Sequence, residues 1–153
     1  MKNLVLTAIS ILFCTFIQAQ TVRKELNEME CGPLSCKNTM TIENGKDTSY
    51  YVWCGFQNEK YNYITDIGSV MFLWEEDITE FISDLNKMKG YLDSLGNDVD
   101  IRKRRYELLV YPFNTELYIQ SDGKYATISK TELEMLVEWL VSVKLPKRPV
   151  LKD

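Results

Sequence analysis

Two cysteines on either side of a turn are the residues of this sequence best suited to covalent chemistry. Cys31 and Cys36 flank a Gly32-Pro33 turn, and Cys54 follows in a β-rich segment. Such thiols can exchange disulfides, bind a metal ion as thiolates, or form a structural disulfide. The rest of the chain decides among these three chemistries.

The neighbours of Cys31 disfavour thiol–disulfide exchange. Catalytic pairs are usually separated by two residues at the N-terminus of a helix, which lowers the thiol pKa. Here four residues separate the cysteines, no helix start follows, and Glu28 and Glu30 raise a nearby thiol pKa instead. We therefore expect a structural disulfide, and the sequence leaves open whether Cys36 joins Cys31 or Cys54.

The chain contains no histidine. This excludes Ser-His-Asp and Cys-His catalysis, zinc sites with histidine ligands, and the usual general base near neutral pH. Three thiolates alone would lack a fourth metal ligand, and no phosphate loop, dinucleotide fingerprint or nucleophile elbow is present. We expect no metal site and no cofactor, and we favour a protein that is not an enzyme.

The first twenty residues have the pattern of a secretory signal peptide. Lys2 gives a positive start, residues 4–17 form an apolar run too short for a membrane span, and Ala19-Gln20 offers a cleavage site. We expect export to the periplasm or beyond, with no membrane span after cleavage. The polar residues 21–30 disfavour a retained anchor, and the bulky residues before Cys14 disfavour a lipoprotein.

Cleavage after residue 20 leaves an acidic chain. It removes one of the 18 basic side chains and none of the 22 acidic ones, so the net charge becomes 17 − 22 = −5. This balance disfavours general attraction to nucleic acid or anionic membranes. The remaining length, about 130 residues, suits one domain with its own core.

The first half of this domain is expected to be a β-meander followed by a helix. Asn44-Gly45 is a strong hairpin signal. The expected strands cover residues 40–42, 49–56, 61–65 and 70–74. Asp77 is expected to cap the following helix, with Glu80 reaching back. The apolar face of this helix would consist of Ile78, Phe81, Ile82, Leu85, Met88, Leu92 and Leu95.

The second half has the same order of elements. Strands are expected in residues 106–113, 116–121 and 124–128, with a tight turn at Asp122-Gly123. Ser129 and Glu132 match a capping box that opens a closing helix. Its apolar stripe would consist of Leu133, Leu136, Val137, Leu140 and Val141. Pro146 and Pro149 then stop regular structure.

These elements predict an α+β fold in which an antiparallel β-meander followed by a helix occurs twice, with the helices packed on one face of the sheet. The units would cover about residues 39–95 and 104–145, within a domain of residues 39–145. A polar segment, residues 21–38, would precede it, and residues 146–153 would form a tail. In topology alone, residues 39–143 resemble the meander-plus-helix units of PUR-type nucleic-acid-binding proteins. No diagnostic motif supports carrying over residues or function.

Charged clusters have local explanations. Glu75-Glu76-Asp77 suits the positive end of a helix dipole, and Glu132, Glu134 and Glu138 suit the solvent face of the last helix. The basic run of residues 102–105 is interpreted as an exposed linker, balanced by Asp93, Asp98 and Asp100.

Aromatic residues give the clearest signal for binding. Side chains of a strand alternate between its two faces, so the aromatic residues of the first meander cannot all lie under a helix. The residues expected to form an exposed aromatic face are Tyr51, Trp53, Tyr61 and Tyr63. Such a face can bind a partner or stabilise the sheet through cross-strand pairs.

The resulting functional hypothesis is a small exported binding protein without catalytic activity, such as a periplasmic inhibitor or an immunity-like protein. Its partner would be a protein, and no nucleic acid is expected. The alternatives are an exported enzyme that uses carboxylates or a thiol and, third, a nucleic-acid-binding repeat protein.

Overall fold

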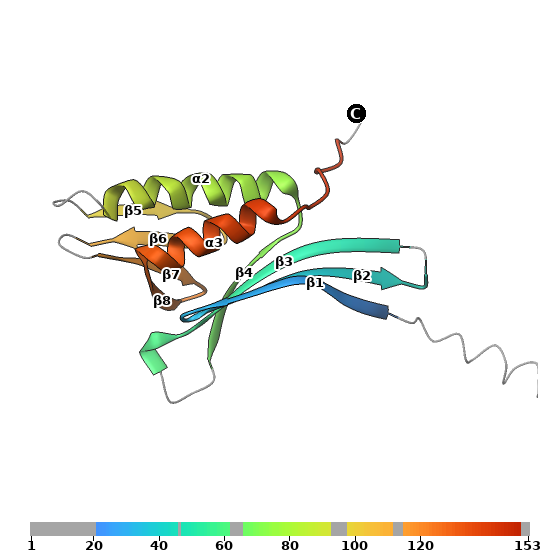
Figure 1. The fold of residues 1–153 in the computed structure, drawn as a ribbon, viewed down its shortest axis with the longest axis horizontal. Coiled ribbons are helices and arrows are strands. Elements are labelled where there is room, and N and C mark those ends of the chain that lie inside the picture. Colours follow the sequence, from blue (N-terminus) through green and yellow to red (C-terminus); the bar gives the residue numbers. More distant parts are fainter. Residues whose placement is uncertain (1–20, 46, 62–65, 93–97, 112–114, 151–153) are drawn as a thin grey trace, which may run out of the picture.

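The computed structural model describes residues 21–45, 47–61, 66–92, 98–111 and 115–150. It has the predicted α+β fold, with a β-meander followed by a helix in each half (Figure 1). The meanders form two separate four-stranded antiparallel sheets, in the orders β1-β2-β3-β4 and β5-β6-β7-β8. We call them the first and the second sheet. Within the described residues, no helix is long and apolar enough to cross a membrane.

The bounds of the elements follow the chain. The first unit consists of β1 (Thr21–Cys31), β2 (Leu34–Glu43), β3 (Asp47–Gln57), the short 3₁₀ helix η1 (Glu59–Tyr61), β4 (Ile67–Phe72) and α2 (Glu75–Leu92). The second consists of β5 (Val99–Arg102), β6 (Glu107–Val110), β7 (Glu116–Ser121), β8 (Lys124–Ser129) and α3 (Lys130–Ser142).

Two tight hairpin turns lie where the sequence predicts them. Asn44 and Gly45 have φ values of 52° and 68°, and Asp122 and Gly123 have φ values of 51° and 73°. Positive φ at both central residues matches the right-handed twist of the flanking strands, and asparagine, aspartate and glycine tolerate it best.

The prediction that residues 21–38 form a polar segment ahead of the sheet is wrong. Thr21–Cys31 is an edge strand that pairs with β2, and its register shifts between Glu25 and Asn27, with Leu26 as the extra residue. An edge strand that is solvated on both faces needs no alternation of apolar and polar residues, so its hydrophobic pattern does not mark it.

A strand was also expected over residues 61–65, and the prediction that it begins at Tyr61 is wrong. Tyr61 ends the 3₁₀ helix η1, residues 62–65 lie outside the described part of the chain, and the next strand is β4. Glu59 accepts hydrogen bonds from the Thr127 amide and hydroxyl of β8. This contact with the second sheet replaces the expected strand pairing.

Helix α2 begins two residues earlier than predicted, at Glu75. Because the helix starts at Glu75, Asp77 is a helical residue and not the cap. The Glu75 amide at the helix start donates to the carbonyl of Pro146. The predicted apolar face of α2 is confirmed, because Ile78, Phe81, Leu85 and Met88 are buried. Leu95 lies outside the described residues.

In the second unit, β5 was missed because it has only four residues and leads directly into the basic run 102–105. The later strands, and the capping box between Ser129 and Glu132, are confirmed. On α3, Leu133, Leu136 and Leu140 are buried as predicted, together with Trp139. Val141 is 66% exposed, so its place in the apolar stripe is wrong.

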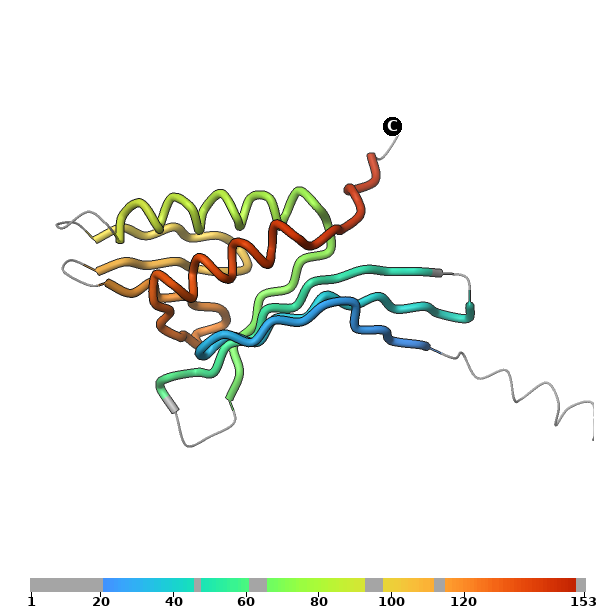
Figure 2. Tube along the Cα trace, in the orientation of Figure 1, coloured from blue at the N-terminus to red at the C-terminus, as the bar shows by residue number. Residues whose placement is uncertain are grey.

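Helices α2 and α3 pack against each other over one shared core (Figure 1). Phe81 of α2 illustrates how this core joins the two units. Its ring centroid lies 4.9 Å from that of Phe72 on β4 and 4.6 Å from that of Tyr106, next to β6. Beyond the helices, the ends of β1, β2 and β3 extend as an arm (Figure 2).

Where the edges of the two sheets meet, side chains of each unit form hydrogen bonds with backbone groups of the other. Alternate carbonyls of β4, those of Ile67, Ser69 and Met71, accept hydrogen bonds from Lys124, Ser121 and Arg105 of the second unit. In return, Asn58 and Glu59 of the first unit accept the amides of Tyr125 and Thr127 on β8. We call this region the edge joint. It leaves β1 as the solvated edge of the first sheet.

Candidate binding surface

The first sheet has one face in the core and one face directed away from the helices. Burial alternates along β3, with Val52 and Cys54 buried between the partly exposed Tyr51 and Trp53. Tyr51 and Trp53 therefore lie on the outer face, as the alternation predicts. Tyr63 lies outside the described residues, and the side chain of Tyr61 is not described.

Trp53 is packed flat on this outer face. A methyl group placed on Gly55 would meet carbons of the Trp53 six-membered ring at 2.1 to 2.8 Å, so the ring covers this glycine. The covered backbone holds the indole in one orientation, which lowers the entropy that binding would cost. Glycine at this position leaves room for the Trp53 ring and is buried beneath it.

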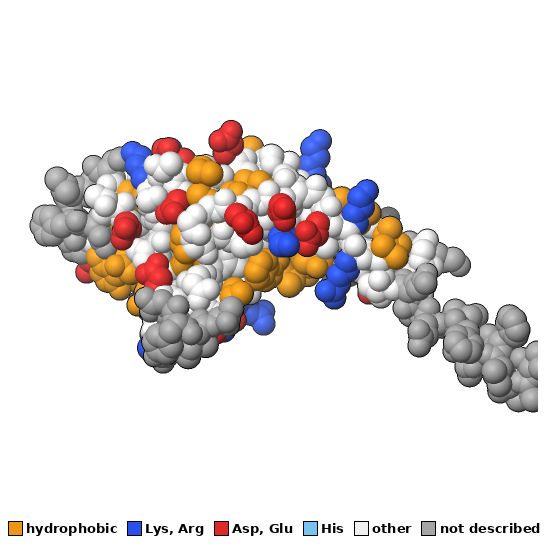
Figure 3. Space-filling view, turned by 60° about the horizontal axis from the view of Figure 1, so that its bottom comes forward, with side chains coloured by type: hydrophobic (Ala, Val, Ile, Leu, Met, Phe, Trp, Pro, Cys, Tyr) orange, Lys and Arg blue, Asp and Glu red, His pale blue; other side chains and the backbone are white. Residues whose placement is uncertain are grey.

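Met71 extends the aromatic residues into a larger apolar area. It is the register partner of Trp53 on β4 and is 48% exposed. Ile67 on the same strand is 46% exposed, and Leu73, just after it, is 42% exposed. We call Tyr51, Trp53 and Met71 the outer-face patch. Seen from below, the molecule shows separate hydrophobic patches between acidic and basic side chains (Figure 3).

A hollow of about 370 Å³ lies next to this patch, between β4 and the turns of the second sheet. Met71 and Leu73 line it on one side, and Arg104 and Asp122 on the other. The Ser69 and Met71 carbonyls at this edge already accept hydrogen bonds from Ser121 and Arg105. A ligand in the hollow would therefore be recognised by side chains and not by strand addition.

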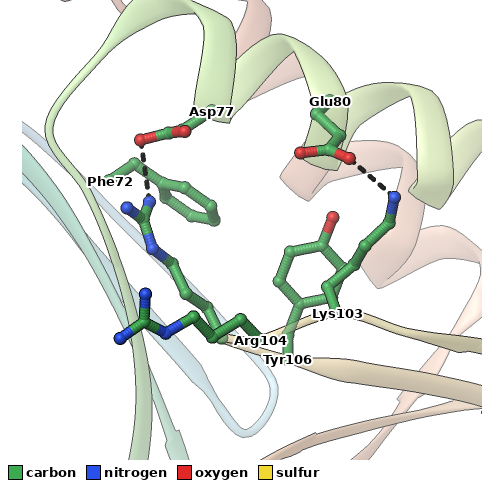
Figure 4. Close-up of a pocket in the computed structure, with 7 residues that line it drawn as sticks. Phe72, Asp77, Glu80, Lys103, Arg104 and Tyr106 are labelled. Carbon is green, nitrogen blue, oxygen red and sulfur yellow. Dashed lines mark hydrogen bonds and ion pairs between the residues drawn. The ribbon is translucent and has the colours of Figure 1, made fainter.

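The basic run 102–105 forms the end of β5 and the turn before β6, and three of its four cations are paired. Lys103 Nζ lies 2.6 Å from Glu80 Oε1, Arg105 Nη1 lies 2.8 Å from Asp77 Oδ2, and Arg102 pairs with Asp100. Arg104 has no ion pair or hydrogen bond within the described residues, and its guanidinium points away from the Asp77 and Glu80 carboxylates (Figure 4).

Tyr106 and Asp84 form a buried polar pair behind this turn. The Tyr106 hydroxyl donates to Asp84 Oδ2 at 3.0 Å, and Lys87 Nζ lies 3.0 Å from Asp84 Oδ1. Burial, and then the hydrogen bond and charge of Asp84, raise the pKa of Tyr106. The phenol is therefore a poor proton donor to a substrate, and the pair is best explained as a satisfied buried carboxylate.

The predicted disulfide is absent. Cys31, Cys36 and Cys54 are all buried and free. Cys36 and Cys54 are register partners on β2 and β3, whereas Cys31 donates to the Met135 sulfur on α3 at 3.5 Å. The Cys31–Cys36 pairing failed because the Gly32-Pro33 turn directs β1 and β2 into a hairpin, in which Cys31 opposes Leu34. The Cys36–Cys54 pairing is also absent, since these register partners are free thiols.

The environment of these thiols also disfavours reactivity. A hydrogen bond with Cys36, followed by burial, raises the pKa of Cys54 well above its usual value. Burial, and then the charge of Glu132, raise the pKa of Cys31. A thiol held protonated is a weak nucleophile and a weak metal ligand.

The acidic clusters have structural partners. Glu132 closes the capping box, Glu134 pairs with Lys89 of α2, and Asp77 pairs with both Arg105 and Arg148. Across the described ranges, no group of three or more cysteine, aspartate or glutamate side chains is arranged to hold a metal ion.

The sequence analysis missed two residues of the surface. The position of Met71 beside Trp53 depends on the pairing of β4 with β3. Whether Arg104 is paired depends on which basic side chains the acidic residues of α2 reach. The uneven pairing of a basic run is a signal that only the fold supplies.

Comparison with known proteins yields no match: no protein-family model, curated protein or solved structure resembles this chain significantly.

Proposed function

We propose that this protein is an exported, non-catalytic binding protein whose outer-face patch docks a protein partner. The observation that carries the proposal is the pairing of partly exposed Trp53 with exposed Met71 on the sheet face away from the helices. Export rests on the signal-peptide pattern of the first twenty residues. An inhibitor or an immunity-like protein would use a surface of this kind.

The composition of the patch supports this proposal. Tryptophan, tyrosine, methionine and arginine are enriched at protein interfaces, and a few rigid aromatic residues supply most of the binding energy. Trp53 is held against Gly55, and Tyr51 and Met71 flank it on the same face.

The chemistry of the described residues favours binding over catalysis. The chain has no histidine, and the thiols at Cys31 and Cys54 are buried with raised pKa values. Asp84, although buried in a groove, is satisfied by Tyr106 and Lys87. None of these groups is placed as an activated nucleophile or base.

The proposal is tested by capture on the immobilised protein. The protein is incubated with an envelope and secreted extract of its source cells, and the retained proteins are identified and their affinity measured. Trp53→Ala should weaken the retained interaction by at least about tenfold, because a central interface aromatic contributes about 2 kcal/mol or more.

A matched pair of methionines separates the patch from general stickiness. Met71 and Met135 are 48% and 44% exposed, but Met135 lies on α3. Met71→Gln should reduce capture and Met135→Gln should leave it unchanged. Retention that is indifferent to Trp53→Ala and Met71→Gln, in variants with unchanged circular dichroism, overturns the proposal.

A further inference from the structure

The hollow beside the outer-face patch contains a cation that has no counter-ion among the described residues. Lys103 and Arg105, on either side of Arg104, are neutralised by Glu80 and Asp77 at 2.6 and 2.8 Å. Arg104 is exposed, and within the described residues it contacts neither acid.

Arg104 also lines three hollows of the surface. It lines the hollow of about 370 Å³ beside Met71 and two further hollows, of about 310 and 230 Å³. Its guanidinium is directed away from the Lys103–Glu80 and Arg105–Asp77 pairs, as Figure 4 shows. A guanidinium in a concave site is well suited to bind a carboxylate through two parallel hydrogen bonds.

We propose that Arg104 is the specificity-determining residue of the outer-face patch and that it binds a carboxylate side chain of an acidic, apolar protein segment. This inference rests on the proposed function and adds the chemistry of the partner. Apolar side chains of the segment contact Trp53, Met71 and Leu73, and its carboxylate reaches Arg104 across the hollow. Because the β4 carbonyls are occupied, the segment binds through its side chains.

The charges around the hollow limit how many carboxylates fit. Asp122 lines the same hollow, and Glu107 and Asp122 line the adjacent one. Arg105 is already shared between Asp77 and the Met71 carbonyl. One carboxylate at Arg104 is therefore favoured, and a run of negative charges is opposed by Asp122.

The test uses the purified protein and three labelled peptides of equal length, in which leucine alternates with glutamine and a single central position is glutamate, lysine or glutamine. We expect the glutamate peptide to bind most tightly, with an affinity that falls as salt rises. Arg104→Glu should weaken it by about tenfold and make the lysine peptide the preferred one.

Asp122→Asn provides a second, opposite variant. Asparagine tolerates the positive φ of this turn position, so the hairpin is retained. Removing the opposing charge should strengthen binding of the glutamate peptide a few-fold. A control, Arg102→Glu, changes the charge of the same basic run by the same amount but lies outside these hollows, and it should preserve the preference for glutamate.

The outcomes separate this inference from the proposed function. Weakening by Trp53→Ala, with no effect of Arg104→Glu or equal binding of all three peptides, keeps the patch and overturns the role of Arg104. Failure of the glutamate peptide to bind at its highest soluble concentration also overturns the inference, while capture by the patch can still succeed. Tighter binding of a single-stranded oligothymidylate through Arg104 overturns it in favour of nucleic acid.

Discussion

The two sheets have the same order of elements and strands of very different length. The first sheet has strands of 11, 10, 11 and 6 residues, and the second has strands of 4, 4, 6 and 6 residues. The longer strands of the first sheet extend past the helices (Figure 2). The proposed docking surface lies on this sheet, where Trp53 of β3 and Met71 of β4 are register partners.

The two edges of the first sheet are protected in different ways. At the edge joint, side chains of each unit satisfy the backbone of the other, so this edge cannot accept another strand. The opposite edge, β1, is protected differently, by its charged residues and by the extra residue Leu26. The proposed docking of a partner therefore uses side chains of the outer-face patch and not the strand edges.

The strongest test of the shared core is Phe81→Ala. Phe81 is fully buried and contacts Phe72 from the first sheet and Tyr106 from the second unit. Its loss should cost about 3–5 kcal/mol of the free energy of unfolding, because a cavity forms between both units. Chemical unfolding followed by circular dichroism and tryptophan fluorescence should show one transition. Two separate transitions would show that the units are independent.

Val141→Ala is the matched control for this experiment. Val141 lies on α3 but is 66% exposed. The substitution should change the free energy of unfolding by less than about 0.5 kcal/mol.

The edge joint can be weakened at Glu59. Its carboxylate accepts both the amide and the hydroxyl of Thr127, so Glu59→Gln removes the negative charge that strengthens both hydrogen bonds. We expect a loss of about 1–2 kcal/mol in the free energy of unfolding. Glu116→Gln, at an exposed residue of β7, should have little effect, and equal losses in the two variants would contradict the joint.

A smaller effect should appear in the pH dependence of the same joint. Hydrogen bonds from Lys124 and Asn58 lower the pKa of Asp66 from its ordinary value of 3.8. A carboxyl whose pKa is lower in the folded than in the unfolded state stabilises the fold at pH values above its unfolded-state pKa. This stabilisation is lost as the pH falls through its folded-state pKa.

At neutral pH, the midpoint of thermal unfolding should therefore be higher for the wild-type protein than for Asp66→Asn. This difference should shrink as the pH falls below 3.8. Lys124→Gln should flatten the same acid limb, because it removes the partner that contributes most to the shift. A difference that grows on acidification would contradict the assignment.

The smallest expected effect concerns the thiols of the first sheet. Since Cys31, Cys36 and Cys54 are buried and free, a reductant should leave the thermal midpoint unchanged. A thiol reagent should label them slowly in the folded protein and rapidly in denaturant. A marked loss of stability on reduction would show that a disulfide contributes to the fold.

Local signals predicted the second half of the chain well. The Asp122-Gly123 turn and the capping box of Ser129 and Glu132 are determined by neighbouring residues, so sequence alone located them. By contrast, β1 is an exposed edge strand without an apolar pattern, and β5 has only four residues. The short helix η1 is held by the contact between Glu59 and Thr127, which are far apart in the chain.

The candidate surface divides in the same way. The outward position of Tyr51 and Trp53 follows from the alternation of side chains along a strand. The exposure of Met71 beside Trp53 follows from strand register. The tertiary pairing of Lys103 and Arg105 leaves Arg104 without a partner in the part of the chain that the structure describes. The prediction of a Cys31–Cys36 disulfide failed for a related reason, because the hairpin register places Cys31 opposite Leu34.

Oxidative footprinting of the two exposed methionines tests the central claim most directly. The protein is oxidised alone and with the partner retained by capture, and the oxidation of Met71 and Met135 is quantified by mass spectrometry. Their similar exposure, 48% and 44%, makes each a reference for the other. The outer-face patch predicts that the partner protects Met71 and leaves Met135 reactive. Protection of Met135 alone, or of neither residue, would contradict it.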